Sequence, residues 1–318
     1  MIVVAILAVY ALAAAVLLPR LLTRAHWSER APRLAIAMWL AACSSVVASA
    51  VMGGLAAAIP PDAIGHGLAG LFEACAALLA AGFDTAASSW GARAALLLSG
   101  LIVARTTYCL SAVLFTARRE RARHAEMLSL VGRHDGDLGA IVLDHGERLA
   151  YCLPGRQGKT VITTGALQSL APAHVAAVLA HERAHLRGRH HLVLAVAEAF
   201  ARACPRVPLF ARAKSEVVRL IELLADDVAA RHHPRAHIAA ALVGLATGRV
   251  PAFALGAGGE TALTRVRRML NPAVPLHRRE KLAGMAAVGA LLAGPTALAA
   301  IPGLSSFVAH HCHALSLL

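Results

Sequence analysis

Residues 178–187 read Val-Leu-Ala-His-Glu-Arg-Ala-His-Leu-Arg, and this stretch determines how the rest of the chain is interpreted. His181 and His185 are four positions apart, so on a helix their side chains lie one above the other and can bind one metal ion. Glu182 lies beside them, where a carboxylate can take the proton of a water activated by the metal. The stretch therefore predicts a helix that carries a metal site and a general base.

Two carboxylates follow on a second predicted helix, at residues 209–230. Glu222 would complete a His-His-Glu set with His181 and His185, which leaves one position of a tetrahedral zinc ion open, as a hydrolase requires. Asp226, one turn further on, is placed to hold a ligand histidine by its other ring nitrogen. The alternative is a surface salt bridge between Glu222 and a nearby arginine. Both motifs together favour one Zn²⁺ ion.

The segment around these motifs is predicted to combine strands and helices. Alternating apolar residues and turn signals predict a β-meander over residues 140–143, 149–153 and 160–164. Helical periodicity follows over residues 174–186, 192–203, 209–230, 237–247 and 260–270. His190 and His191, after the first of these helices, are interpreted as a solvated continuation of the basic residues before them.

The composition favours a membrane protein. Of 318 residues, 58% are hydrophobic and only 15% are charged, which argues against a soluble monomer and against disorder. Residues 118–281 contain 25 of the 31 basic and 14 of the 18 acidic residues, a net charge of +11. Direct nucleic-acid binding is not expected, because aromatic residues are few and no such motif is present. A basic face beside an anionic lipid leaflet explains this charge.

Four apolar segments are close to the length of about 20 residues that crosses a bilayer. Arg105, in the third segment, would cost about 2.5–3.5 kcal/mol there unless it snorkels or faces the bundle. A mainly α-helical membrane protein with about four transmembrane helices is predicted. Its expected parts are spans 2–18, 34–59 and 94–117 within region 1–117, an outer loop 60–93, a domain 118–281, a last span 282–301 and a tail 302–318.

The distribution of arginine and lysine predicts the orientation, because basic flanks stay on the cytoplasmic side. The first loop has four arginines, whereas loop 60–93 has one arginine and three acidic residues. Both termini are therefore expected outside and the domain in the cytoplasm. The apolar stretch His66–Phe83, which contains Glu73, is interpreted as interfacial or re-entrant, because a further span would reverse this orientation.

The six cysteines do not form a Cys-x-x-Cys pair, so neither a cysteine zinc site nor a redox motif is expected. Cys75 and Cys312 both fall outside in the predicted topology. A disulfide between these two residues is compatible with that topology, and so are two free thiols.

The chain resembles the membrane-embedded zinc peptidases of the BlaR/MecR signal-transducer type, which are related to the HtpX and CAAX-prenyl-protease gluzincins. The resemblance covers most of the chain and rests on residues 151–155, 161–167, 179–185 and 222–226 and on the layout of the spans. It implies a zincin-like α+β domain inserted between the third and fourth spans. The roles that it implies are zinc ligands for His181, His185 and Glu222, general base and acid for Glu182, and support of a ligand for Asp226.

The resemblance also implies that the strand at 160–164 is the edge on which an extended substrate pairs. The substrate-binding residues predicted on this basis are Val161, Ile162, Thr163 and Thr164. Arg235, His237 and Arg265 are candidates for stabilising the transition state.

The function predicted from these features is a membrane-embedded zinc endopeptidase that cuts proteins or peptides at the cytoplasmic face of the cell membrane. The resemblance suggests a winged-helix repressor of the BlaI type as substrate. One alternative is an HtpX-like quality-control protease. The other is a non-catalytic sensor with a structural metal, and the presence of Glu182 argues against this sensor. Residues 302–318 contain no Ser-x-x-Lys motif, so direct β-lactam sensing is not expected.

Overall fold

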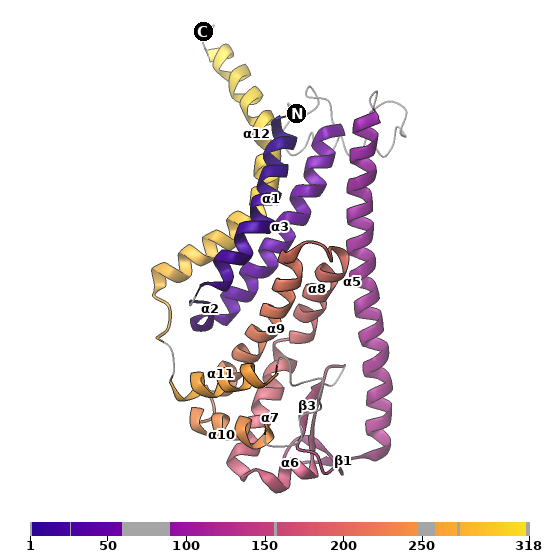
Figure 1. Ribbon diagram of the computed structural model, residues 1–318, viewed down its shortest axis with the longest axis vertical. Coiled ribbons are helices and arrows are strands. Elements are labelled where there is room, and N and C mark those ends of the chain that lie inside the picture. Colours follow the sequence, from indigo (N-terminus) through magenta and orange to yellow (C-terminus); the bar gives the residue numbers. More distant parts are fainter. Residues whose placement is uncertain are drawn as a thin grey trace.

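The computed structural model describes residues 2–25, 27–58, 90–155, 158–246, 258–271 and 274–315. Long helices form a bundle at one end, and a smaller part with the sheet lies at the other (Figure 1). In chain order the elements are α1 (Ile2–Thr23), α2 (Trp27–Arg30), α3 (Pro32–Ala58), α5 (Trp90–Val131), β1 (Gly132–Asp135), β2 (Ala140–Leu143), β3 (Ala150–Leu153), β4 (Lys159–Thr163), α6 (Thr164–Ser169), α7 (Pro172–Arg187), α8 (His190–Ala203), α9 (Pro208–Ala229), α10 (Arg235–Ala246), α11 (Gly258–Leu270) and α12 (Arg278–Leu315).

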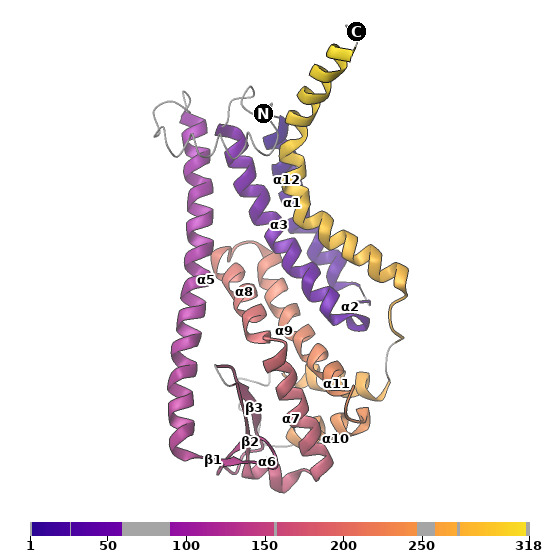
Figure 2. The same ribbon diagram turned by 180° about the vertical axis from the view of Figure 1, so that it is seen from behind.

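Four helices of the described chain, α1, α3, α5 and α12, are long and apolar enough to cross a membrane. They correspond to the four predicted apolar segments, and the number of such helices is confirmed. Helices α1, α3 and α12 pack together, and α5 stands on the other side of α3 (Figures 1 and 2). Their length and composition make the chain compatible with a multi-pass membrane protein. The stretch His66–Phe83 and the pair Cys75 and Cys312 lie outside the described residues and side chains.

Helix α5 passes the predicted end of its span at residue 117 and continues to Val131. Its 42 residues correspond to roughly 63 Å, about twice the hydrocarbon thickness of a bilayer. Residues 118–131 extend the helix because arginine, glutamate, leucine and alanine favour it. Near its end Leu128 packs against Ile141, Leu153 and Val161 of the sheet. The third apolar helix is thus joined directly to the sheet.

The hairpin formed by α8 and α9 lies between α3 and α5 (Figures 1 and 2). Leu209, Phe210 and Val217 of α9 share a buried core with Ile36 and Trp39 of α3. Burial of such large side chains contributes about 1.5–3 kcal/mol each. The helical bundle and the α8–α9 hairpin therefore have a common hydrophobic core.

Arg105 of α5 binds the end of this hairpin. Its Nε donates to the carbonyl oxygen of Ala203 at 2.6 Å, and Nη2 donates to that of Arg202 at 3.3 Å. The last carbonyls of a helix lack partners within the helix and carry the negative end of its dipole. Arg105 thus faces the bundle and caps α8, which accounts for a charge in an apolar helix.

The sheet has the strand order β1-β2-β4-β3, with β2 and β4 parallel and the other two pairs antiparallel. The predicted β-meander is therefore wrong, although three of the four strands were located. Strand β4 lies between β2 and β3, where the Thr163 hydroxyl donates to the carbonyl oxygen of Glu147 at 2.6 Å. Local alternation predicts strands but not their partners, and it did not reveal β1.

The prediction that residues 160–164 form a substrate-binding edge is also wrong. Strand β4 pairs with a strand on each side, and Val161, Ile162 and Thr163 are 0% exposed. Thr164 begins α6 and its hydroxyl donates to the His145 carbonyl oxygen at 3.1 Å. A central strand has no free backbone groups for another chain. The edges of the described sheet are β1 and β3, and β3 packs next to α7.

The five predicted helices after the sheet correspond to α7 to α11, with ends within two residues of the prediction. Helix α7 starts with Pro172 at its first turn, where a missing N–H costs nothing. Its apolar face, with Val175, Val178 and Leu179, packs on the sheet next to Ile162. This packing fixes the orientation of the helix that carries His181 and His185.

Candidate metal centre

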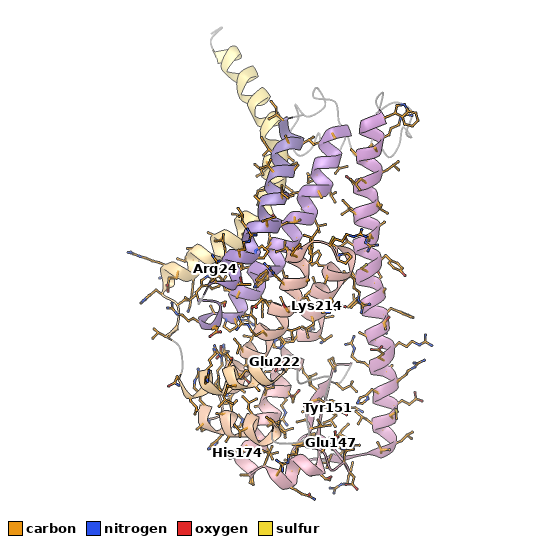
Figure 3. All side chains as sticks on the ribbon, viewed as in Figure 1. Arg24, Glu147, Tyr151, His174, Lys214 and Glu222 are labelled. Atoms are coloured by element: carbon orange, nitrogen blue, oxygen red, sulfur yellow. The ribbon has the colours of Figure 1, made fainter. Side chains whose placement is uncertain are left out.

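His181 and His185 of α7 converge with Glu222 of α9. Nε2 of His181 lies 3.1 Å from Nε2 of His185. The Glu222 carboxylate is 3.5 Å from each ring, through Oε2 to His181 Nε2 and Oε1 to His185 Nε2. Figure 3 shows Glu222 on α9 in the region where this helix approaches α7. Among the described residues, these three form the cluster whose donor atoms could hold a metal ion.

The spacing of these atoms fits a tetrahedral zinc ion. Ligands at the usual Zn–N and Zn–O distances of about 2.0–2.1 Å are separated by roughly 3.3–3.4 Å along a tetrahedral edge. The three observed separations lie between 3.1 and 3.5 Å. Two imidazoles and one carboxylate are also ligands that zinc prefers. The residues present therefore fit one zinc ion with a fourth position left for another ligand.

Asp226 and Arg265 support this cluster from the α9 and α11 sides. Asp226 is 0% exposed, and its Oδ1 lies 2.9 Å from Nδ1 of His181. Arg265 Nε donates to Oδ2 and Nη2 to Oδ1 of Asp226, both at 2.8 Å. Arg265 Nη1 is 3.0 Å from Oε2 of Glu222. One guanidinium thus forms ion pairs with two carboxylates, and Asp226 fixes which nitrogen of His181 faces Glu222.

The protonation of the cluster follows from these contacts. Burial would lower the pKa of His181, but its hydrogen bonds to Asp226 and Glu222 raise that pKa to about 9. Burial lowers the pKa of His185 to about 4. Burial alone would raise the pKa of Glu222, whereas its hydrogen bond with His181 and the charge of Arg265 bring it to about 2. Two of the three candidate ligands are therefore unprotonated at neutral pH, and His181 carries the proton that a metal must displace.

Glu182 has a buried environment of its own. Burial raises the pKa of its carboxyl group, although the charge of His181 opposes this effect. Burial, together with the charge of Glu182 and a hydrogen bond with it, raises the pKa of the Cys152 thiol on β3 to about 12. Cys152 is thus a neutral donor next to the candidate base. The position of Cys152 is not visible from the sequence, because it depends on the packing of β3 next to α7.

His190 is a second residue that sequence reasoning missed. It is 5% exposed rather than solvated, and its Nδ1 lies 3.0 Å from Nδ1 of His185. It therefore holds the ring nitrogen of His185 that faces away from Glu222. The sequence contains one signal of this packing, which is the glycine two residues before His190. A Cβ at position 188 would collide with the His190 ring.

The three candidates for transition-state stabilisation are placed differently. Arg265 lies in the cluster, as described above. His237 stacks edge-on against His174, which is two turns before His181 on α7, with ring centroids 5.6 Å apart. Arg235 lies beside Met269, with Nη1 4.0 Å from its sulfur. The structure brings Arg265 to the metal centre and places Arg235 and His237 in contacts elsewhere.

The comparison with protein families gives independent support. Residues 117–215 match the model of peptidase family M48. The matched stretch includes the helix with His181, Glu182 and His185 and ends before Glu222. Comparison with curated proteins and with solved structures gave no match. The similarity to family M48, whose members are typically zinc-dependent, supports a metallopeptidase.

Proposed function

We propose that this protein is a membrane-embedded zinc endopeptidase that hydrolyses peptide bonds at the cytoplasmic face of the membrane. The observation that carries the proposal is the convergence of His181, His185 and Glu222 at tetrahedral spacing, with Glu182 next to His181 on the same helix. The match to family M48 and the four apolar helices support the metallopeptidase class and the membrane location.

The division of labour follows from the positions of the side chains. His181, His185 and Glu222 would hold the ion, with Asp226 and His190 orienting the two imidazoles. Bound zinc supplies a Lewis acid that polarises the scissile carbonyl and lowers the pKa of a water molecule. Glu182 accepts the proton of the attacking water and returns it to the leaving amine. Its raised pKa makes Glu182 a stronger proton acceptor than an exposed glutamate.

We assign the substrate-pairing edge to β3 instead of residues 160–164. Its outer backbone groups have no partner strand in the described sheet, and Cys152 on this strand lies beside Glu182. An extended peptide added to β3 would gain main-chain hydrogen bonds next to the candidate base. Arg265 is assigned a positioning role, because both carboxylates that it contacts belong to the metal centre.

The decisive experiment replaces Glu182 by glutamine in the full-length, zinc-loaded protein. Glu182→Gln keeps the size of the side chain and removes the proton acceptor, so proteolysis should fall about 10²- to 10⁴-fold while metal analysis still finds one zinc. The matched control is Glu147→Gln, a carboxylate exposed on the surface. Undiminished proteolysis by Glu182→Gln would refute the mechanism. A zinc-loaded wild type with no more activity than this variant would favour a sensor with a structural metal.

The cytoplasmic orientation is tested separately. Arg123 lies on the part of α5 that extends beyond the predicted span. Because Cys75 and Cys312 are expected outside, the test uses a background in which the six native cysteines are replaced by serine. In the proposed topology, Arg123→Cys in this background should be protected from a membrane-impermeant thiol reagent in intact cells and become labelled after the cells are opened. Labelling in intact cells would place this domain outside.

The resemblance to the BlaR/MecR type supports a small winged-helix repressor as the substrate. The similarity to family M48 leaves quality control of membrane proteins as the second candidate. The two make different predictions for cells that produce the wild type or Glu182→Gln. Loss of one or two repressors would indicate signalling, and many membrane-protein fragments would indicate quality control.

A further inference from the structure

A large basic groove lies between α5 and the residues at the end of β3 and the start of β4, 153–155 and 158–159. Its volume is about 970 Å³. Arg118 and Arg121 of α5 line one side and Lys159 lines the other, and none of the described lining residues is acidic. Leu114, Leu153 and Leu192 supply apolar walls. The groove thus offers three positive charges and an apolar floor without anions of its own.

The α5 wall is a continuous stripe. Leu114, Arg118, Arg121 and Ala125 follow one another at helical spacing and so share one face of α5. From Leu114 to Ala125 this stripe extends roughly 16 Å along the helix axis, which is the length of about five residues of extended chain. Because Leu114 belongs to the apolar segment, the groove starts at the level where α5 leaves it and continues away from the bundle.

The groove shares two elements, β3 and α8, with the surroundings of the candidate metal centre. Leu153 lies at the end of β3, which packs next to α7, the helix that carries Glu182. On the opposite wall, Leu192 is two residues beyond His190, whose ring contacts His185. A peptide that pairs with the free edge of β3 and extends past Leu153 therefore enters the groove. Antiparallel pairing, which is slightly more stable per residue, would place the N-terminal side of the substrate there.

We propose that this groove binds an acidic segment of the substrate on the N-terminal side of the scissile bond, an inference that rests on the proposed peptidase function. The complementary charge of Arg118, Arg121 and Lys159 supplies the recognition, and the β3 edge supplies the alignment. The site would favour substrates with aspartate or glutamate within about five residues before the cleaved bond.

An anionic lipid headgroup is the other ligand that such charges could attract. The headgroup layer on one side of a bilayer is only about 5–8 Å deep. The groove extends roughly twice as far along α5 and ends beside β3. Its length and its contact with β3 therefore favour a peptide.

The experiment uses the full-length, zinc-loaded protein in neutral detergent with a mixture of random-sequence peptides, and mass spectrometry identifies the ends of the products. Wild-type products should show acidic residues enriched before the cleaved bond and not after it. The double variant Arg118→Glu/Lys159→Glu should lose or reverse this preference, with about a tenfold lower kcat/KM on acidic peptides. The matched control Arg119→Glu/Arg123→Glu changes the same charges at exposed positions outside the groove and should keep the preference.

A binding measurement tests peptide recognition by the groove independently of catalysis. Zinc-loaded Glu182→Gln should bind a fluorescent peptide with an aspartate-rich N-terminal half more tightly than one with asparagine at those positions, and Arg118→Glu/Lys159→Glu should abolish the difference. Equal flanking preferences in wild type and groove variant would overturn the groove proposal while zinc-dependent cleavage upheld the peptidase. Absence of zinc-dependent cleavage, with the binding difference intact, would instead refute the peptidase. An effect of the groove variant only on stimulation by added phosphatidylglycerol would identify a lipid site and overturn the peptide proposal.

Discussion

Two neighbouring aspartates on α9 form the same kind of ion pair with two arginines of α11 but serve different regions. Asp226 accepts two hydrogen bonds from Arg265 at 2.8 Å, and Asp227 accepts two from Arg268 at 2.8 and 2.7 Å. Asp226 is 0% exposed and also holds His181, whereas Asp227 is 26% exposed. Successive residues of a helix point about 100° apart, so one pair faces the metal centre and the other faces away from it.

The second pair connects α9 and α11 to the beginning of the bundle. Arg268 also donates to the carbonyl oxygen of Glu29 in α2, through Nε at 3.1 Å and Nη2 at 2.8 Å. The comparison shows that geometry alone does not define a functional ion pair. What distinguishes Asp226 is its third contact, to a candidate zinc ligand.

Replacing the two aspartates should have the largest effects. Asp226→Ala leaves Arg265 with Glu222 as its remaining anionic contact in the cluster, so we expect a loss of about 3 kcal/mol in unfolding free energy, at the lower end for a broken buried pair, together with loss of zinc. Asp227→Ala should cost about 1 kcal/mol, because its carboxylate is 26% exposed and Arg268 keeps the Glu29 carbonyl oxygen as an acceptor, and should keep zinc. Denaturant unfolding in detergent and metal analysis measure both. Equal losses of stability and zinc would remove the distinction between the pairs.

The adjacent histidines of α8 provide a second test of the same contrast. His190→Ala removes the partner of His185 Nδ1, and loss of such a partner typically weakens metal binding 10- to 100-fold. His191→Ala removes an imidazole from the next position and should leave zinc affinity within about twofold, because it projects in another direction. Competition with a zinc-binding dye measures both affinities. A weak effect of His190→Ala would show that His185 is oriented without it.

A conservative substitution should then sharpen the role of the outer pair. Arg268→Lys keeps the charge but loses the fork of donors that spans Asp227 and the Glu29 carbonyl. We expect about 1 kcal/mol of destabilisation with zinc affinity unchanged. Thermal unfolding and the same dye competition report the two quantities. A fall in zinc affinity would mean that the outer pair also sets the metal centre.

The smallest expected effect is the release of a single proton when zinc binds. At pH 7 the His181 imidazole, with its pKa raised to about 9, is protonated, whereas His185 and Glu222 with pKa values near 4 and 2 are not. Zinc binding should therefore release about one proton at pH 7. The apparent zinc affinity should rise with pH up to about 9 and level off above it, where the release falls toward zero. Asp226→Asn should reduce this release and Asp227→Asn should not. Calorimetry in buffers with different ionisation enthalpies measures it.

The local sequence pattern was sufficient to predict the helices and the residues that meet between α7 and α9. The four-residue spacings of His181 and His185 and of Glu222 and Asp226 place pairs on single helix faces, and the packing of two such helices brings them together. The apolar segments were equally visible, because span length is a property of the local sequence.

Pairing between distant segments was not predictable in the same way. The insertion of β4 between β2 and β3 depends on contacts across the sheet, so both the meander and the substrate edge were misassigned. Burial of His190 depends on the tight turn at Gly188 and Arg189, where Arg189 adopts a φ of 48°. The partner of Arg105 lies 98 positions further along the chain.

The position of the α8–α9 hairpin connects the helical bundle mechanically to the candidate metal centre. Phe210, packed against α3, and Glu222 lie on one unbroken helix, about 18 Å apart along its axis. A tilt of about 5° at the Phe210 end would displace Glu222 by roughly 1.5 Å, and misplacement by 1 Å can change a catalytic rate about 100-fold. Ile221 and Leu223, on either side of Glu222, belong to the same core as α3. In the proposed peptidase, a rearrangement among the apolar helices would therefore move Glu222 and change the catalytic rate.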